Sequence, residues 1–173
     1  MDRKWILGGI GLIAIAVIGR LIPHASNITP LYAVALFACA VFPKRWAIVV
    51  PVVAMIASDL MIGMHATVMF TWTGMLAFAA FGYGIRESRT TTKIVGSALA
   101  GSIVFFIWTN FGHWLTMGMY PMNGAGLAAC YTAALPFFRN STLGNLAFSG
   151  ALFAAYEWYR VRKAAKVAQA VTA

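Results

Sequence analysis

The chain of 173 residues has only four carboxylates, and one of them, Asp59, lies inside an apolar run from Ala47 to Met64. An ionised side chain at the centre of a bilayer costs about 2.5–3.5 kcal/mol on insertion scales, so such an acid normally faces a protein interior or a polar cavity. Arg20, in another apolar segment, is a candidate ion-pair partner for Asp59. The alternative is that its side chain extends to the membrane surface. These charges predict a polar site inside a membrane protein.

Other polar side chains that interrupt apolar segments are expected to belong to the same site. Arg20 and His24 lie four residues apart and His113 lies three residues after Asn110, so each pair would share a helix face. A simpler interpretation of Asn110 and His113 is an interhelical hydrogen bond that fixes packing. The predicted substrate-binding residues are Arg20, His24, Asn27, Asp59, His65, Asn110, His113, Trp114, Tyr120, Tyr131, Arg139 and Asn140.

The sequence contains no familiar catalytic or metal-binding motif. The three histidines and Asp59 come from separate segments, and their spacing matches no short ligand motif, so we expect no metal site. G-x-S-x-G, H-E-x-x-H and Walker sequences are absent from the chain. We therefore predict neither an enzyme nor a bound cofactor. Cys39 and Cys130 are too few for a disulfide framework and are expected to be buried free thiols.

The composition is that of a membrane protein. Hydrophobic residues make up 61% of the chain, charged residues only 10%, and the mean hydropathy is +0.79, whereas soluble domains have about 25% charged residues. At about 20 residues per span, the length allows one domain of six helices. We predict an all-α integral membrane fold with six transmembrane helices and one short interfacial or re-entrant helix.

The apolar segments place these elements along the chain. The predicted spans are Trp5–Ile22, Ile28–Phe42, Ala47–Met64, Ala66–Ile85, Ile94–Leu115 and Leu143–Tyr159. The segment Leu127–Leu135 is about half the length needed to span a bilayer, and Pro136 follows it, so it is predicted as the short interfacial or re-entrant helix. Thr29 is a plausible N-cap for the second span, with Pro30 at its first position.

The basic residues predict the orientation. With six alternating spans, eleven of the thirteen lysines and arginines fall on the side that carries both termini, and only Arg20 and Arg139 lie elsewhere. An excess of basic residues marks cytoplasmic loops, so both termini are predicted to be cytoplasmic. The single transmembrane domain is placed at 1–159 and a basic tail at 160–173, which we expect to be partly disordered or to lie on anionic lipid. We attribute the formal charge of +9 to these cytoplasmic basic residues, and we predict no nucleic-acid partner.

Four groups of residues resemble a family of small bacterial membrane proteins whose activity is undefined. They are Arg20-x-x-Pro23-His24-x-x-Asn27-x-Thr29-Pro30; Ser58-Asp59 with Gly63 and His65; Asn110-Phe111-Gly112-x-Trp114 with Tyr120-Pro121; and the run from Gly126 to Asn140. The resemblance covers most of the chain and implies a multi-pass protein of the bacterial inner (cytoplasmic) membrane.

In size, span number and an outward-facing polar pocket, the chain also resembles the substrate-binding S components of energy-coupling-factor vitamin transporters. That resemblance implies an S-component-like bundle and a vitamin-like ligand. Trp5–Ile22 lacks the Ala-x-x-x-Ala pattern with which S components commonly dock on their energising module, so that partner is left open. The related vitamin B12 transporters carry a cobalt-binding cysteine soon after an aspartate, whereas no cysteine follows Asp59 until Cys130.

Two functional hypotheses follow. The first is a small-molecule uptake or substrate-binding protein in the lipid bilayer, whose periplasm-facing pocket holds a vitamin or cofactor-precursor-like ligand. Trp72, Trp114, Tyr120 and Tyr131 would stack on a flat ring, and Leu127–Leu135 would act as a movable lid. The second is a membrane scaffold without a ligand, whose polar side chains only hold helices together. A converging cavity favours the first, and separate local pairing favours the second.

Overall fold

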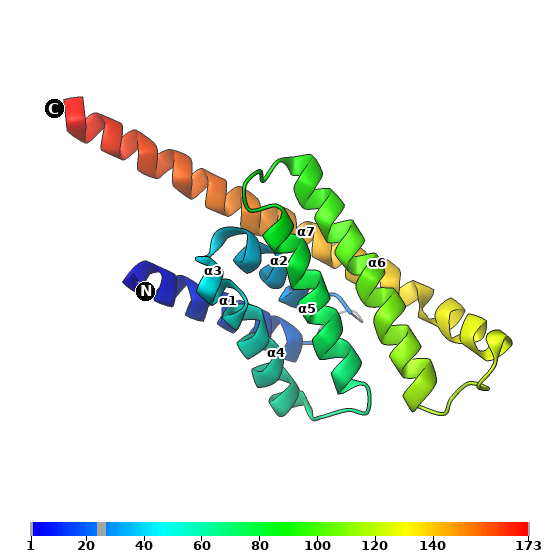
Figure 1. The fold of residues 1–173 in the computed structure, drawn as a ribbon. Coiled ribbons are helices and arrows are strands. Elements are labelled where there is room, and N and C mark those ends of the chain that lie inside the picture. Colours follow the sequence, from blue (N-terminus) through cyan, green and yellow to red (C-terminus); the bar gives the residue numbers. More distant parts are fainter. Residues whose placement is uncertain (1, 24–26, 173) are drawn as a thin grey trace.

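The computed structural model describes residues 2–23 and 27–172, and this part of the chain is entirely helical. Its elements are α1 (Arg3–Leu21), α2 (Leu31–Val41), α3 (Lys44–Ala47), α4 (Val49–Ile62), α5 (Val68–Gly84), α6 (Thr91–Thr116) and α7 (Gly124–Thr172), drawn in Figure 1. The predicted all-α class is confirmed. Within the described ranges, α3 is a single turn that leads into α4.

Three segments of the described chain are long and apolar enough to cross a bilayer: Arg3–Leu21, Lys44–Ile62 and Thr91–Thr116. The prediction of six such spans is therefore met only in part. The second predicted span, Ile28–Phe42, forms a helix of just 11 residues, which is about 16 Å long against a hydrocarbon core of about 30 Å. Helix α5, with 17 residues, is at the lower limit of the usual spanning length.

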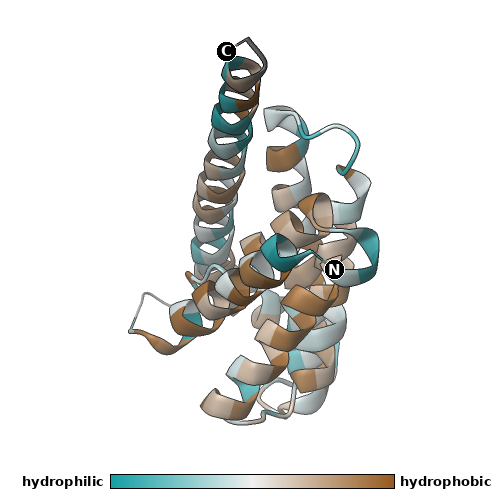
Figure 2. Cartoon of the chain, turned by 90° about the vertical axis from the view of Figure 1, so that its left-hand side faces the viewer, coloured by the Kyte–Doolittle hydropathy of each residue, from teal (hydrophilic) through white to brown (hydrophobic). Residues whose placement is uncertain are grey.

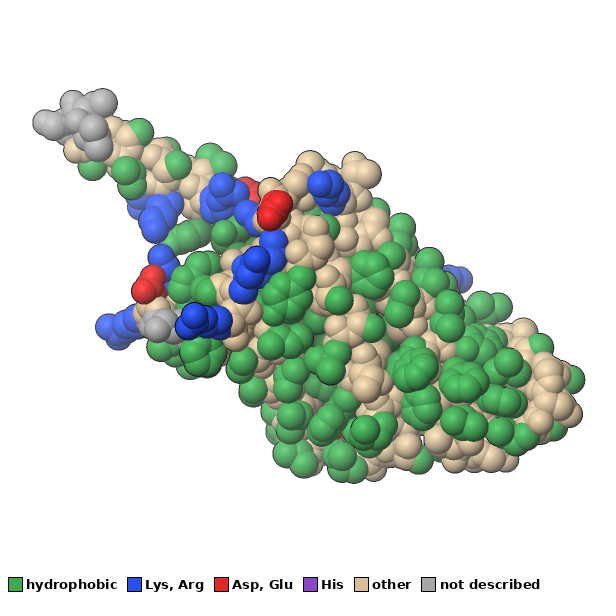
Figure 3. All heavy atoms as spheres, in the orientation of Figure 1, with side chains coloured by type: hydrophobic (Ala, Val, Ile, Leu, Met, Phe, Trp, Pro, Cys, Tyr) green, Lys and Arg blue, Asp and Glu red, His purple; other side chains and the backbone are tan. Residues whose placement is uncertain are grey.

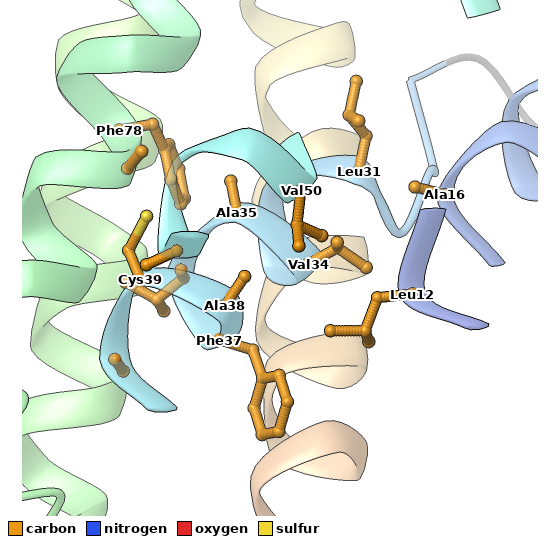
Figure 4. Packing of buried hydrophobic residues seen from close by; sticks show 14 of the residues in the cluster. Leu12, Ala16, Leu31, Val34, Ala35, Phe37, Ala38, Cys39, Val50 and Phe78 are labelled. Atoms are coloured by element: carbon orange, nitrogen blue, oxygen red, sulfur yellow. The ribbon is translucent and has the colours of Figure 1, made fainter. Parts of the chain in front are cut away.

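The short helix α2 lies at the centre of the fold. It contacts α1, α4, α5 and α7, and every residue from Ala33 to Ala40 is buried. Figure 4 shows Val34, Ala35 and Ala38 among side chains of neighbouring helices. The alanines leave room for close helix approach, which explains why this segment is surrounded by protein. Thr29 Oγ1 accepts a hydrogen bond from the Leu31 N–H at 3.2 Å, but Pro30 is the N-cap and α2 begins at Leu31, so the predicted helix start is displaced by one residue.

The carboxyl end of α2 is held by arginines from the connection between α5 and α6. The guanidinium of Arg86 donates hydrogen bonds to the carbonyl oxygens of Cys39 and Phe42, and Arg89 donates to that of Ala40 at 3.3 Å. The last carbonyls of a helix have no partner within it, and cations are favourable at that end. These two residues, predicted only as boundary charges, thus terminate the central helix.

The last helix corrects two predictions. Leu127–Leu135 is not a separate interfacial or re-entrant element, because it continues through Pro136 into the predicted sixth span as one helix, α7. The tail from Arg160 is also helical as far as Thr172, rather than partly disordered. A proline removes one backbone donor, but the flanking turns remain helical, and the tail is rich in Ala, Lys and Arg, which are strong helix formers.

Charge and hydropathy divide the molecule into two ends. Figure 3 shows most lysines and arginines gathered at the end that carries both termini, while hydrophobic side chains cover much of the remaining visible face. In Figure 2 hydrophilic colour lies at the N-terminus and along the last turns of α7, and hydrophobic colour lies along the other helices. Large apolar side chains such as Leu7, Leu60 and Ile107 are exposed, as expected of surfaces that face lipid.

Candidate functional site

The ion pair predicted from the sequence is confirmed. Arg20 lies in the last turn of α1, and its Nη1 is 2.7 Å from Oδ1 of Asp59 on α4. The same nitrogen is 2.6 Å from the hydroxyl oxygen of Ser58 and 3.3 Å from the sulfur of Met55. The Asp59 side chain is 1% exposed and that of Arg20 is 20% exposed. The acid is thus fully buried, while its partner reaches toward the surface.

The second carboxylate oxygen of Asp59 is also satisfied. Trp72 Nε1, on α5, donates a hydrogen bond to Oδ2 at 2.7 Å. Buried charges are tolerated only when they are paired and fully hydrogen-bonded, and this carboxylate meets both conditions. Since its partners come from α1 and α5, Asp59 joins three helices at the end of the bundle opposite the chain termini. Gly63, with a φ of 110°, ends α4 one turn after Asp59.

A cavity of about 580 Å³ adjoins this cluster. It lies among the start of α2, α5, the second half of α6, the first half of α7 and the loop before α7. Its polar lining comprises Arg20, Asn27, Thr29, Tyr32, Thr67, Thr71, Ser102, Thr109, Asn110, His113, Tyr120, Ser141 and Asn145. Its apolar lining includes Phe78, Phe105, Phe106, Met119, Phe137 and Phe138. The volume falls within the usual range for small-molecule sites.

Five predicted site residues line this cavity: Arg20, Asn27, Asn110, His113 and Tyr120. The Asn110 amide also donates to the Phe106 carbonyl at 2.8 Å, and the His113 and Tyr120 rings lie 6.4 Å apart. The structure therefore brings together polar side chains from α1, α6 and the loops on either side of the cavity.

Other predicted site residues do not line it. Asp59 lies behind Arg20. His65 is exposed and its Nδ1 lies 2.8 Å from the hydroxyl oxygen of Thr67. Trp114 donates to the Pro121 carbonyl at 3.0 Å and Tyr131 to that of Ile107 at 2.6 Å.

Three further predictions complete the set. Arg139 is exposed on α7, and Asn140 lies beside it; neither belongs to the described lining. His24 lies outside the described residues. The predicted binding set thus overlaps the cavity lining on α1, on α6 and in the loops, and none of its members on α7 belongs to that lining.

The deepest polar group of the cavity was missed. Asn145 on α7 is 2% exposed, and its amide donates to the Ser102 hydroxyl on α6 at 3.0 Å. Its carbonyl oxygen Oδ1 has no hydrogen-bond partner within the described chain. A polar side chain in an apolar segment is the signal that singled out Asp59, so the sequence held the same evidence for Asn145.

Aromatic rings form the apolar side of the cavity. Tyr32 and Phe105 have ring centroids 4.6 Å apart, as do Phe106 and Phe138. Both pairs are tilted, and together they supply a large apolar wall. Cys130 also lines the cavity, and both cysteines are free and buried, as predicted. Among the described residues no group of three or more His, Cys, Asp or Glu side chains could hold a metal ion.

The fold and the site define a helical protein with three segments, among its described residues, that are long and apolar enough to cross a membrane, and with a partly polar, partly aromatic cavity of ligand size. The chain belongs to a family of unknown function, DUF6580, whose sequence pattern matches residues 2–169. This confirms the resemblance to an uncharacterised family, but it does not bear on the resemblance to S components. Neither a curated protein nor a solved structure matches the chain.

Proposed function

We propose that this protein binds a small molecule in the cavity between α2, α5, α6 and α7, as a step in uptake across a membrane. The observation that carries the proposal is the cavity itself: hydroxyl and amide groups from four helices converge on about 580 Å³, opposite an aromatic wall. Sites for small ligands typically combine apolar walls with a few placed polar groups. The scattered local hydrogen bonds of a simple packing interface would not need such a space.

The lining indicates the class of ligand. Arg20 is the only permanently charged side chain in the described lining, and its charge is balanced by Asp59. The unpartnered Oδ1 of Asn145 calls for a donor on the ligand, because a buried carbonyl without a partner costs free energy. A largely uncharged molecule with a flat ring and N–H or O–H groups, of the kind found in vitamins and their precursors, fits these features.

The arrangement of charges supports an orientation. The cavity lies at the end of the bundle away from both termini, and the basic residues gather at the terminal end (Figure 3). By the excess of basic residues on cytoplasmic segments, the terminal end faces the cytoplasm and the cavity faces the periplasm. We count six membrane-embedded helices, with the short α2 and α5 enclosed among tilted longer neighbours or crossing a locally thinned bilayer.

The scaffold hypothesis has an observation of its own. Asp59, Trp114 and Tyr131 do not line the cavity, and each is hydrogen-bonded to groups of neighbouring segments, as a role in holding helices together would require. Under this alternative the cavity would contain lipid or water only. The two functions therefore differ in whether a defined small molecule occupies the cavity.

Filling the cavity tests the proposal. Ala134 lines it, whereas Ala129 is exposed on the same helix and does not. We expect Ala134→Phe to weaken retention of a copurifying small molecule by about tenfold to a hundredfold, since overpacking costs about 1–3 kcal/mol. Mass spectrometry of gently solubilised protein measures this retention, with Ala129→Phe as the matched control. An empty parent protein, or equal retention in both variants, would favour the scaffold.

A further inference from the structure

A second hollow lies at the opposite end of the molecule, between α1 and the last turns of α7. It has a volume of about 1020 Å³. The start of α1 and the end of α2 form one side, with Trp5, Leu12 and Phe42, and α7 forms the other, with Tyr156 and Val161. Figure 3 shows lysines and arginines on both sides of the gap between the two chain ends.

The walls of this hollow are apolar although the region is rich in charge. Trp5 packs on Phe42 with ring centroids 5.0 Å apart, and Phe37 packs on Tyr156 at 5.7 Å. Across from them, Val161 and Val167 of α7 are 67% and 57% exposed. An exposed apolar concavity of this size marks an interaction site. The last turns of α7 stand away from the bundle and leave it open.

The rim of the hollow is cationic. Lys4, Arg160 and Lys163 line it, and six basic but only two acidic residues occur within positions 2–4 and 157–166. Glu157 also lines the hollow and pairs with Arg160 at 2.9 Å. Lys4 lies 3.5 Å from an exposed Asp2, and Lys163 forms no ion pair with any described residue. The remaining charge is positive on both walls.

We propose that this hollow binds an anionic phospholipid, whose phosphate lies between Lys4 and Lys163 and whose acyl chains lie along Trp5, Gly8 and Leu12. Apolar walls that end in a basic rim match the chemistry of such a lipid. Trp5 lines the hollow and Trp158 is exposed on α7, and tryptophans are enriched at membrane interfaces. An acidic peptide would satisfy the charge but would not need walls continuous with the apolar surface of α1. This inference is independent of the function proposed for the polar cavity.

Charge removal is the first arm of the test. Full-length protein in bilayer nanodiscs of phosphatidylcholine and phosphatidylglycerol is analysed by native mass spectrometry for retained phosphatidylglycerol. Each surface lysine or arginine contributes about a factor of five to attraction of anionic lipid, so Lys4→Gln with Lys163→Gln should lower retention about thirtyfold. The control, Lys44→Gln with Arg45→Gln, removes the same charge from exposed positions outside the hollow and should retain the lipid.

Filling the hollow is the second arm. Gly8 lines it and Gly11 does not, although both lie on α1 and are exposed. Gly8→Leu should abolish retention of phosphatidylglycerol while leaving every charge in place, and Gly11→Leu should not change it. The proposal is overturned if both charge variants lose the lipid equally, if Gly8→Leu retains it, or if the purified protein carries an acidic peptide in its place.

Discussion

Asp59→Leu is expected to lower the free energy of unfolding by about 3–5 kcal/mol, the cost of removing one partner from a buried ion pair. The substitution leaves the Arg20 guanidinium without its carboxylate and the Trp72 indole N–H without an acceptor. An unsatisfied buried donor adds to the loss. The measurement is an unfolding titration in mixed detergent micelles, followed by tryptophan fluorescence.

Two variants sharpen this prediction. Glu87→Leu removes an exposed carboxylate and should change stability by no more than about 0.5 kcal/mol. Arg20→Met combined with Asp59→Leu should recover most of the loss, because two apolar side chains replace a buried ion pair at little cost. If the double variant is as unstable as Asp59→Leu alone, the damage comes from lost packing rather than from an uncompensated charge.

Gly82→Ala is expected to destabilise the fold by about 2–3 kcal/mol, although it adds a single methyl group. Gly82 lies on α5 against the central helix, and a Cβ there would overlap the carbonyl oxygen of Leu36 and lie 2.8 Å from the Cβ of Cys39. Backbone atoms cannot rotate away as a flexible side chain can, so α2 and α5 would have to separate. Thermal unfolding in detergent measures the loss.

Gly96→Ala is the matched control for this glycine. It lies inside α6 with no heavy atom within 4 Å of an added Cβ, so the same substitution should stabilise the helix by about 0.5–1 kcal/mol. Opposite signs at the two positions would show that α5 and α2 require direct contact. A stable Gly82→Ala variant would contradict the close packing of these two helices.

The ion pair at the site could be predicted from the sequence, because a buried charge is tolerated only beside a partner of opposite charge. A lone acid in an apolar segment needs a cation, and Arg20 was the basic residue in another apolar span, so their pairing at 2.7 Å could be predicted. The sequence did not reveal that Trp72 would satisfy the other oxygen and close Asp59 off from the cavity. Helix rotation decides which neighbours a side chain meets, and an almost wholly apolar segment carries little information about rotation.

The all-α class of the fold could be predicted from the sequence, but the boundaries of some helices could not. Pro136, followed closely by Arg139 and Asn140, resembled a helix boundary, yet α7 continues through all three. Tertiary packing overrides such local signals. The partners of a polar residue are equally hard to predict: Asn145 stands out in its apolar segment, but only the contact between α6 and α7 brings it to Ser102 at the cavity.

The proposed function requires the cavity and the basic end to lie on opposite sides of a membrane, and cysteine labelling measures this directly. With both native cysteines replaced by alanine, Thr67→Cys places a thiol in the cavity lining and Lys44→Cys places one at the basic end. In intact bacterial cells a membrane-impermeant thiol reagent should label Thr67→Cys and not Lys44→Cys. Labelling of Lys44→Cys from outside, or of both positions from the same side, would contradict the account.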